Sequence, residues 1–501
     1  MTDFTVSRLF SDHAVLCREK EIRIFGKAQK RTHLIAALYD AADQLLAQDS
    51  LVAEDAFVFR LPPQKAQNDC RLDIFSDKER VSFRDIAIGD VYLANGQSNM
   101  ELELQNADEG AVLVKTHCNP QVRYYNVPKF ARGTREADEA NENAVWRAIA
   151  PEVGSDMSAA AYFFAMKLQP EIGVPVGIID CYWGGTSIAC WMNEETLRST
   201  AEGARYEKEY SEQCAGKSME AYLEEEAAFI REMEEWGKAA EKLKAGRPGI
   251  TPQELNKILG PFPWHPPVGI GSPFRPCGLF HTMLSRTLPV ALTGVLYYQG
   301  EEDTWRTKKY DVLLTSYICM LRDLFRDQEL PFINVQLPMW IDAGAEDSKN
   351  WPRLREAQYK VYRNLRNTGL AILIDEGEYD NIHPTNKRVV GERLYEEAMD
   401  VIYRRPCKKA VYMRGYSIRG NAICVLLSDA VYDTGTGEYL MEIAGEDGEY
   451  KTADLKIEGN LLTLSHPDIA RPVAARYAWT DYAIVRLKGA NGMPLAPFVI
   501  A

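Results

Sequence analysis

Hydrophobic and polar positions divide the chain into regions of different pattern. Residues 1–89 carry short apolar runs separated by turn residues and show no long helical period, which predicts a small antiparallel β-sandwich. The runs expected to form strands are 14–16, 22–25, 34–38, 57–61, 71–75 and 81–86. The pattern changes where Gly89 interrupts an apolar run, so we place the end of an N-terminal domain there.

Residues 90–406 alternate strand-like and helix-like segments. The expected strands are 90–94, 174–179, 295–298, 332–335 and 370–374, and the expected helices are 155–168, 308–325, 353–365 and 386–402. Ser155 or Asp156 could cap the first of these helices. The alternation predicts an α/β domain with a mostly parallel sheet covered by helices.

One segment interrupts this alternation. Residues 202–260 are rich in Glu, Lys and Ala, with apolar residues at roughly helical intervals, and predict an inserted helical hairpin. A lid or a dimer contact is the functional alternative, but an exposed amphipathic excursion is the simpler interpretation. The proline-rich loop 261–276 follows, and it could line a cleft with Phe262 and Trp264.

From residue 407 to 501 the β pattern returns. Short apolar runs are again separated by Gly, Asn and Asp. The expected strands are 410–413, 422–427, 439–443, 461–464 and 482–485. We therefore expect a C-terminal β domain, either separate or packed with the N-terminal sandwich.

Composition narrows the class of protein. Of 501 residues, 46% are hydrophobic and 26% are charged, as in ordinary globular proteins, and no apolar run is long enough to span a bilayer. The net charge of −14 argues against nucleic acid or an anionic membrane as a partner. Ten cysteines form neither a disulfide framework nor a zinc-site spacing, and no secretory signal is visible, so we expect a cytoplasmic protein.

The first candidate for chemistry is Ser98. It follows an apolar strand and Gly96, where the backbone can turn sharply without a Cβ penalty. A serine just past a strand end would lie at the carboxyl edge of the sheet, where open α/β sheets bind their ligands. Taken alone, Gly-Gln-Ser-Asn is more typical of a polar turn than of a catalytic site.

The second candidate is His383, one of only seven histidines in the chain. It lies between an expected strand and an expected helix, so it should reach the same edge of the sheet. Asp380 on the same loop could accept a hydrogen bond from the imidazole Nδ1, which would leave Nε2 facing a nucleophile. As an isolated Asp-x-x-His pattern, it could also be an ordinary loop.

Two more strand ends complete the pattern. Gly184 and Gly185 could present backbone N–H groups to a developing oxyanion, and Gln299 could add a side-chain N–H. A tight turn and a loop amide are the structural alternatives. Together the four strand ends could form one acyl-transfer site, which none of them could form alone.

These residues resemble the motif blocks of SGNH (GDSL-like) hydrolases of the sialate O-acetylesterase type. The matching blocks are 96–100, 183–186, 298–301 and 380–384, and further similarity lies at 9–12, 175–177, 354–358, 476–479 and 494–497. The resemblance implies a three-layer α/β/α catalytic domain that removes O-acetyl groups from a carbohydrate. It also implies Ser98 as nucleophile, His383 as base and Asp380 as the orienting carboxylate.

The same resemblance implies an oxyanion hole formed by the Ser98 N–H, a glycine of the 184–185 pair and Gln299. The residues that we expect to contact substrate are Gln97, Asn99, Trp183, Glu301 and Trp305, and Trp264 is a further aromatic candidate. The chemistry requires no metal and no cofactor.

Two positions depart from the family pattern. The family usually continues the glutamine motif with Gly-Glu-Ser-Asn, whereas here Gly300-Glu301 is followed by Glu302-Asp303, and Cys181 replaces a small residue before the tryptophan. The extra negative charge disfavours an anionic sugar such as sialic acid.

The sequence therefore predicts a serine esterase that removes acetyl groups from O-acetylated sugars, either sialic acid or plant-type oligosaccharides, through an acetyl-enzyme. One alternative is an esterase or thioesterase acting on another small acyl ester. Another is a catalytically silent carbohydrate-binding protein. The sugar, the hydroxyl position and the oligomeric state stay open.

Overall fold

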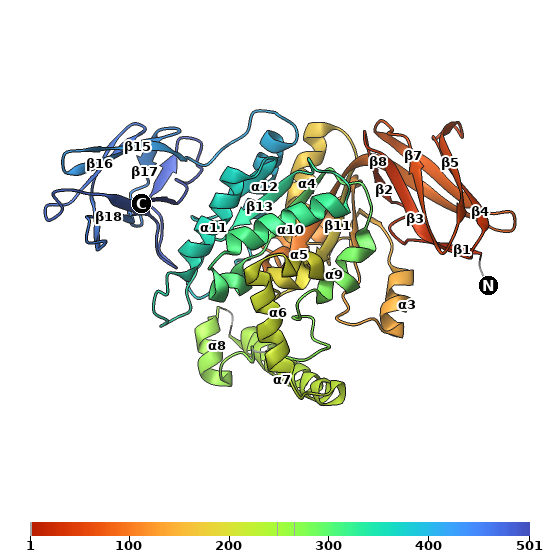
Figure 1. Cartoon of the computed structure of the whole chain (residues 1–501), viewed down its shortest axis with the longest axis horizontal. Coiled ribbons are helices and arrows are strands. Elements are labelled where there is room, and N and C mark those ends of the chain that lie inside the picture. Colours follow the sequence, from red (N-terminus) through yellow and green to blue (C-terminus); the bar gives the residue numbers. More distant parts are fainter. Residues whose placement is uncertain (1–2, 248, 265) are drawn as a thin grey trace.

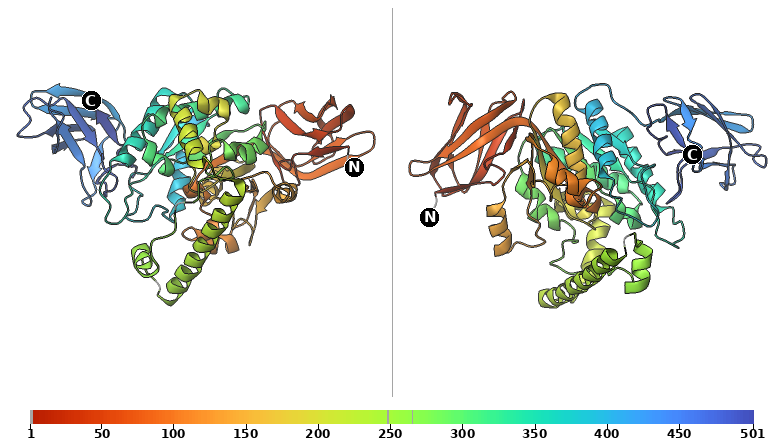
Figure 2. Two further views of the ribbon diagram at one scale, coloured as in Figure 1. Left: turned by 60° about the horizontal axis from the view of Figure 1, so that its bottom comes forward. Right: turned by 180° about the vertical axis from the view of Figure 1, so that it is seen from behind.

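The computed structural model describes residues 3–247, 249–264 and 266–501. An N-terminal β region and a C-terminal β region lie on opposite sides of a central α/β region, and a group of helices projects from the centre (Figure 1). Figure 2 shows the same arrangement from two other directions. This order of regions is the one predicted from the hydrophobic pattern.

The central region is built on a sheet whose strands run in the order β10-β9-β11-β8-β12-β13-β14. All neighbouring pairs are parallel except the edge pair of β10 with β9. The strands are β8 (Arg80–Gly96), β9 (Asn119–Asn126), β10 (Arg147–Ile149), β11 (Val176–Tyr182), β12 (Gly294–Tyr298), β13 (Phe332–Gln336) and β14 (Thr368–Ile372). The predicted mostly parallel sheet is confirmed, and β9 and β10 are additions to it.

Helices cover this sheet. α4 (Ala159–Ile172) packs against α12 (Lys387–Val401), and α10 (Tyr310–Leu324) packs against α11 (Asn350–Asn364). The two pairs lie on opposite faces of the sheet (Figures 1 and 2). Every residue of β11 to β14 is buried, as expected for a parallel sheet enclosed on both faces. The cap of α4 is Ser158, whose hydroxyl accepts from Ala161 N–H, rather than the predicted Ser155 or Asp156.

The strand order places a ligand site at one end of β8. The chain runs from β8 to β9 and β11 on one side and then returns to β12 on the other, so the order reverses at β8. Tyr182 at the end of β11 and Tyr298 at the end of β12 both pair with Gly96. Three strands therefore end at one level, in the crevice where such sheets bind ligands.

The N-terminal region is joined to the catalytic sheet through β8 itself. The first half of this strand pairs with β7 (Gln67–Phe75) and β2 (Val15–Cys17), and the second half enters the parallel sheet. The other N-terminal strands are β1 (Phe4–Val6), β3 (Ile22–Ala28), β4 (Thr32–Tyr39), β5 (Leu45–Ala53) and β6 (Ala56–Leu61). The predicted boundary after Gly89 falls inside this continuous strand, and one hydrophobic core spans both regions.

The C-terminal region shares a hydrophobic cluster with the edge of the central sheet, because Leu370 and Ile372 of β14 belong to the same cluster as its own apolar side chains. Its strands are β15 (Met413–Arg419), β16 (Ala422–Leu427), β17 (Val431–Asp433), β18 (Met441–Ala444), β19 (Tyr450–Thr452), β20 (Asp454–Glu458), β21 (Leu461–Ser465), β22 (Ala474–Tyr477), β23 (Leu487–Gly489) and β24 (Phe498–Ile500). The strands predicted at 410–413 and 482–485 are wrong, because Val411 and Val485 make only isolated bridges. A second β region is confirmed.

The insertion forms three helices rather than the predicted hairpin. They are α6 (Ala201–Cys214), α7 (Met219–Gly246) and α8 (Pro252–Leu259). α7 projects away from the sheet, with α8 beside it (Figures 1 and 2). The remaining helices are α1 (Ser98–Glu101), α2 (Gly110–Thr116), α3 (Arg135–Asn143), α5 (Glu194–Arg198) and α9 (Gly278–Thr282). Across the described residues, no helix is both long and apolar enough to cross a bilayer.

Candidate active site

Ser98 stands at a turn that the sheet holds tightly. Gly96 has a φ of +142°, and a Cβ there would lie 2.0 Å from the backbone oxygen of Tyr298, so only glycine fits. The next residue, Gln97, donates its backbone N–H to the same oxygen at 3.1 Å. Ser98 then begins α1 and points its hydroxyl into the crevice beyond β8.

The structure brings Ser98 and His383 together. His383 lies on the loop between β14 and α12, and its Nε2 is 2.8 Å from Ser98 Oγ. In the tautomer that carries its proton on Nδ1, the imidazole accepts the serine hydroxyl proton at Nε2. This is the contact that a serine nucleophile and its general base require.

The surroundings of His383 keep its imidazole neutral. The ring is partly open to solvent at the mouth of the site, but most of its environment is protein. Desolvation, together with the positive charge of Lys387, lowers the pKa of His383 to about 4. At neutral pH the ring is therefore free to accept a proton from Ser98.

Asp380 is not where the predicted triad requires it. Its φ is +60°, and its Oδ1 accepts from the backbone N–H of Ala343 at 2.7 Å. Within the described chain, Asp380 makes no hydrogen bond to His383, and its Oδ2 has no hydrogen-bond partner. The loop conformation aims the carboxylate at the neighbouring loop, so its role as the orienting acid stays a prediction.

Gly184 faces the nucleophile. A Cβ on Gly184 would lie 3.3 Å from the Cβ of Ser98, so this glycine lets the loop after β11 approach the serine closely. Its N–H donates to Glu101 Oε2, and Glu101 Oε1 accepts from Lys129 Nζ at 2.6 Å. The N–H groups of Ser98 and Gly185 have no hydrogen-bond partner in the described part of the chain, so both remain available to an oxyanion.

Gln299 is buried in the wall of the site. Its Nε2 donates to Asp303 Oδ2 at 2.5 Å, and also to Thr186 O and Gln97 Oε1. Its Oε1 accepts from the hydroxyl of Tyr310 at 2.6 Å. With both N–H groups engaged, Gln299 does not present a donor to substrate here, contrary to the prediction, and its role as an oxyanion donor is unsupported by this geometry.

Asn99 connects the loops that carry the catalytic pair. Its Nδ2 donates to Glu301 Oε1 at 2.6 Å and to the backbone oxygen of Ile382 at 2.9 Å, next to His383. Its Oδ1 accepts from Lys387 Nζ at 2.6 Å. One buried amide therefore links the nucleophile helix to the loop after β12 and to the base loop.

Three of the residues predicted to contact substrate are buried. Burial raises the pKa of the Glu301 carboxyl to about 7 and lowers the pKa of the Lys387 ammonium group to about 8. Both groups therefore titrate close to neutral pH. Gln97, Asn99 and Glu301 were expected to contact substrate, but all three are buried and bond to protein groups. They position the site instead.

Sequence reasoning missed two residues of the site, Glu101 and Lys387. Both lie just after a motif block, since Glu101 follows Gly-Gln-Ser-Asn-Met and Lys387 follows His-Pro-Thr-Asn. Their importance depends on partners from other strand ends, which the sequence does not reveal. Over the described residues, no group of three or more His, Cys, Asp or Glu could hold a metal ion.

The three tryptophans predicted to contact substrate differ in their exposure to solvent. Trp183 is half-buried and packs against the core, whereas Trp305 is 79% exposed. The ring of Trp264 packs on Gly185, where an added Cβ would lie 2.4 Å from it. His265, the next residue, lies outside the described residues.

The acidic departure from the family pattern also has a structural explanation. Asp303 is buried, and besides Gln299 it accepts from the hydroxyl of Tyr206 on α6 and from Ile188 N–H. It therefore anchors the start of the insertion. Glu302 is half-buried, and desolvation raises its pKa to about 7, so its carboxylate is only partly charged at neutral pH.

Comparison with known proteins identifies the family of the chain. A family model described as "Carbohydrate esterase, sialic acid-specific acetylesterase" matches residues 88–221 and 275–400, a little over half of the chain. The chain is 24% identical over 352 residues to the sialate O-acetylesterase of Mus musculus and 22% identical over 375 residues to that of Homo sapiens. These matches cover 64% and 70% of this chain, but only 57% and 61% of the relatives' lengths.

A solved structure resembles the whole chain. The crystal structure of XAC1771, a novel carbohydrate acetylesterase from Xanthomonas citri, has 26% sequence identity and a TM-score of 0.76. The likeness covers 99% of both chains. The two β regions and the insertion therefore lie within the matched architecture.

Proposed function

Because the chain belongs to the sialic acid-specific acetylesterase family of carbohydrate esterases, we propose that it removes acetyl groups from O-acetylated carbohydrates. The observation that carries this proposal is the 2.8 Å contact between Ser98 Oγ and His383 Nε2 at the point where the strand order reverses. The sialate O-acetylesterases and the carbohydrate acetylesterase to which the chain is similar support the substrate class.

The proposed reaction has two halves. His383 takes the proton of Ser98, and Oγ attacks the acetyl carbonyl carbon to form a tetrahedral oxyanion. The N–H groups of Ser98 and Gly185 stabilise the oxyanion, and Gly184 joins them when Glu101 releases it. His383 then gives its proton to the departing sugar oxygen, leaving acetylated Ser98.

Water completes the cycle. His383 removes a proton from a water molecule, which attacks the acetyl carbonyl of Ser98, and collapse of the second oxyanion releases acetate and restores the serine hydroxyl. Asp380 would stabilise the imidazolium in both halves if its Oδ2 turned to Nδ1. The three-residue spacing of Asp380 and His383 on one loop supports that role.

Acetate release from acetylated oligosaccharides tests the proposal. We expect Ser98→Ala to lower kcat by about 10⁴-fold or more, because no nucleophile remains. Ser417→Ala, at an exposed position of β15, is the matched control and should behave as wild type. A serine-directed fluorophosphonate should label the wild type but not Ser98→Ala.

Two results would reject the proposal. Acetate release retained in Ser98→Ala would remove the serine from the mechanism. A wild-type protein that neither reacts with the fluorophosphonate nor releases acetate would instead be a carbohydrate-binding protein with a silent hydrolase core.

A further inference from the structure

A cluster of aromatic rings lies between the insertion and the loop after β11. Phe262 and Trp264 have nearly parallel rings, with 16° between their planes and 6.5 Å between their centroids. They are 39% and 37% exposed, unusually open for side chains of this size and so close to a catalytic crevice. We call this pair the aromatic platform.

The platform adjoins Ser98 through two consecutive glycines. Gly184 faces Ser98, and Gly185 faces Trp264, whose ring an added Cβ would approach to 2.4 Å. Gly185 has a φ of +70°, so a glycine suits both its backbone conformation and the close approach of the indole. Ser98 and the platform therefore border the same pair of glycines.

Other side chains hold the platform in place. The ring of Phe274 meets that of Trp264 edge-on at 6.1 Å. Trp236 on α7 meets Phe262 edge-on at 5.1 Å and donates its Nε1–H to Gly260 O at 3.1 Å. Trp236 also packs on the small core of the insertion, formed by Ala240, Ile250 and Leu255. The insertion thus supports the aromatic platform through the contact of Trp236 with Phe262.

We infer that Phe262 and Trp264 bind the sugar chain that carries the acetyl group, and that this chain is a neutral oligosaccharide rather than a single anionic sugar. The inference rests on the proposed function and specifies its substrate. A pyranose ring presents a face of C–H groups, which an exposed aromatic face can bury, and two rings offer room for more than one sugar. Among the described residues no lysine or arginine stacks on either ring, so both rings are left to apolar contact, which suits a neutral sugar chain.

The platform also lies outside the family blocks. The family model matches residues 88–221 and 275–400, whereas Trp236, Phe262 and Trp264 all fall between these ranges. The catalytic residues fall inside them. This division fits a shared acetyl-transfer site combined with a sugar-binding element carried by the insertion.

Binding of unacetylated oligosaccharides tests the platform separately from catalysis. The probes are xylo-, manno- and cello-oligosaccharides, measured by isothermal titration calorimetry with the full chain. We expect at least one of them to bind, and Trp264→Ala to weaken that binding at least tenfold. Trp264→Phe, which keeps an aromatic face, should recover most of the affinity. Tyr432→Ala removes an aromatic side chain that is 57% exposed in the C-terminal region, and should leave the affinity unchanged.

Kinetics with two esters provides the second test. We expect Trp264→Ala to lower kcat/KM on an acetylated oligosaccharide at least tenfold more than on p-nitrophenyl acetate, mainly through KM, because the small ester cannot reach the platform. Circular dichroism checks that the variant is folded. Wild-type kcat/KM should also rise with the length of the oligosaccharide.

The outcomes separate the two proposals. Hydrolysis of neither ester by the wild type would reject the proposed function, while the binding measurement would still decide the platform. Equal losses on both esters, binding unaffected by Trp264→Ala, or no binding of any oligosaccharide by the wild type would reject the platform. Preference for O-acetylated sialic acid over every neutral oligosaccharide would also reject it.

Discussion

Ser98 and His383, the proposed catalytic pair, are held in different ways. Ser98 follows a central strand, and the turn before it is clamped by backbone contacts between Gly96, Gln97 and Tyr298. His383 lies on a loop that belongs to no strand, and side chains from several regions support it. The nucleophile is thus positioned by the sheet itself, whereas the position of the base depends on more distant parts of the chain.

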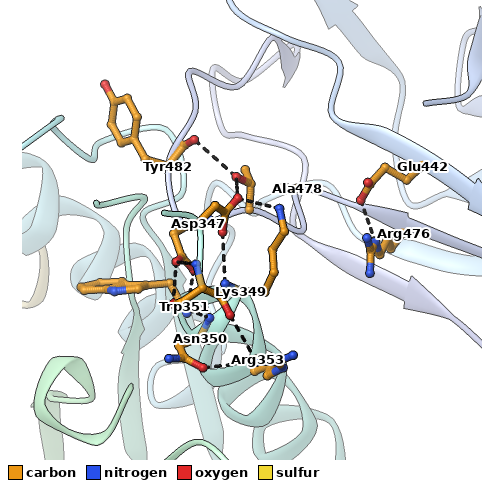
Figure 3. A network of polar contacts seen from close by, with 12 residues as sticks. Asp347, Lys349, Asn350, Trp351, Arg353, Glu442, Arg476, Ala478 and Tyr482 are labelled. Atoms are coloured by element: carbon orange, nitrogen blue, oxygen red, sulfur yellow. Dashed lines mark hydrogen bonds and ion pairs between the residues drawn. The ribbon is translucent and has the colours of Figure 1, made fainter. Parts of the chain in front are cut away.

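Support of the base loop reaches the C-terminal region. Asp380 on this loop bonds to the backbone of Ile341 and Ala343, and the ring of Tyr379 meets that of Tyr482 at 5.5 Å. Figure 3 shows the polar contacts that hold the adjoining segment, including Asp347, Lys349 and Trp351, against the C-terminal region. In this network, Asp481 accepts from Trp351 N–H at 3.1 Å.

The two β regions are attached to the central sheet at different places. The N-terminal region continues the catalytic sheet through β8 and shares its core. The C-terminal region packs on β14, the last strand of that sheet, and contacts the segment that supports the base loop. Changes on the nucleophile side should therefore damage the fold, while changes on the base side should alter activity in graded steps.

The largest effect is expected at Gly96. Gly96→Ala places a methyl group against the backbone oxygen of Tyr298 and forces alanine to a φ of +142°, so we expect the free energy of unfolding to fall by about 3 kcal/mol or more, with loss of activity. Denaturant unfolding measures this. Gly173→Ala is the control, because Gly173 also has a positive φ but no atom within 4 Å of the added Cβ. Similar losses in the free energy of unfolding for both variants would show that the contact with the Tyr298 oxygen is not what requires glycine at position 96.

Asp380→Asn tests the base side directly. If Asp380 stabilises the imidazolium during turnover, its neutral amide should lower kcat by about 10² to 10⁴-fold with little change in unfolding. Asp342→Asn, which removes a neighbouring carboxylate, should keep kcat within a few-fold of wild type. A loss below tenfold in Asp380→Asn would mean that Ser98 and His383 act as a pair without an orienting carboxylate.

Lys387→Met should shift the pH dependence of kcat/KM. Desolvation and the charge of Lys387 lower the pKa of His383 to about 4, and the imidazole must be neutral to act as a base. Wild-type activity should therefore persist above that pH and be lost as the pH falls through it. Without the charge of Lys387 the pKa of His383 rises, and the acidic limb should move up by roughly one pH unit. If the acidic limb of the pH profile is unchanged in Lys387→Met, the charge of Lys387 does not lower the pKa of His383. The exposed Lys456→Met is the control.

The smallest effect on activity is expected from Asp481→Ala. This change leaves the N–H groups of Ser348 and Trp351 without their acceptor, so we expect unfolding to become easier by about 1 to 3 kcal/mol. Activity should fall only a few-fold, because the base loop keeps its bonds to Asn99 and Ala343. Thermal unfolding and kcat measure the two effects. Asp468→Ala, at an exposed ion pair, should change neither.

Much of the fold could be predicted from the sequence. Strands enclosed on both faces appear as continuous apolar runs and the helices as periodic ones, so β12, β13, α10 and α12 were located within a few residues. β9, which lies between β10 and β11, was missed because polar residues at its two ends interrupt the apolar pattern. The three-helix form of the insertion was missed because helical periodicity does not show where a helix breaks.

The order of the regions, the parallel sheet and the placement of Ser98 and His383 at strand ends all follow from local patterns, because hydrophobic period and glycine position act over short distances along the chain. Which polar groups meet depends on the packing of the folded chain. This packing joined Ser98 to His383 and directed Asp380 to Ala343, and it brought Trp264 of the insertion onto Gly185. These contacts connect segments far apart in the chain, and their geometry depends on how whole elements pack.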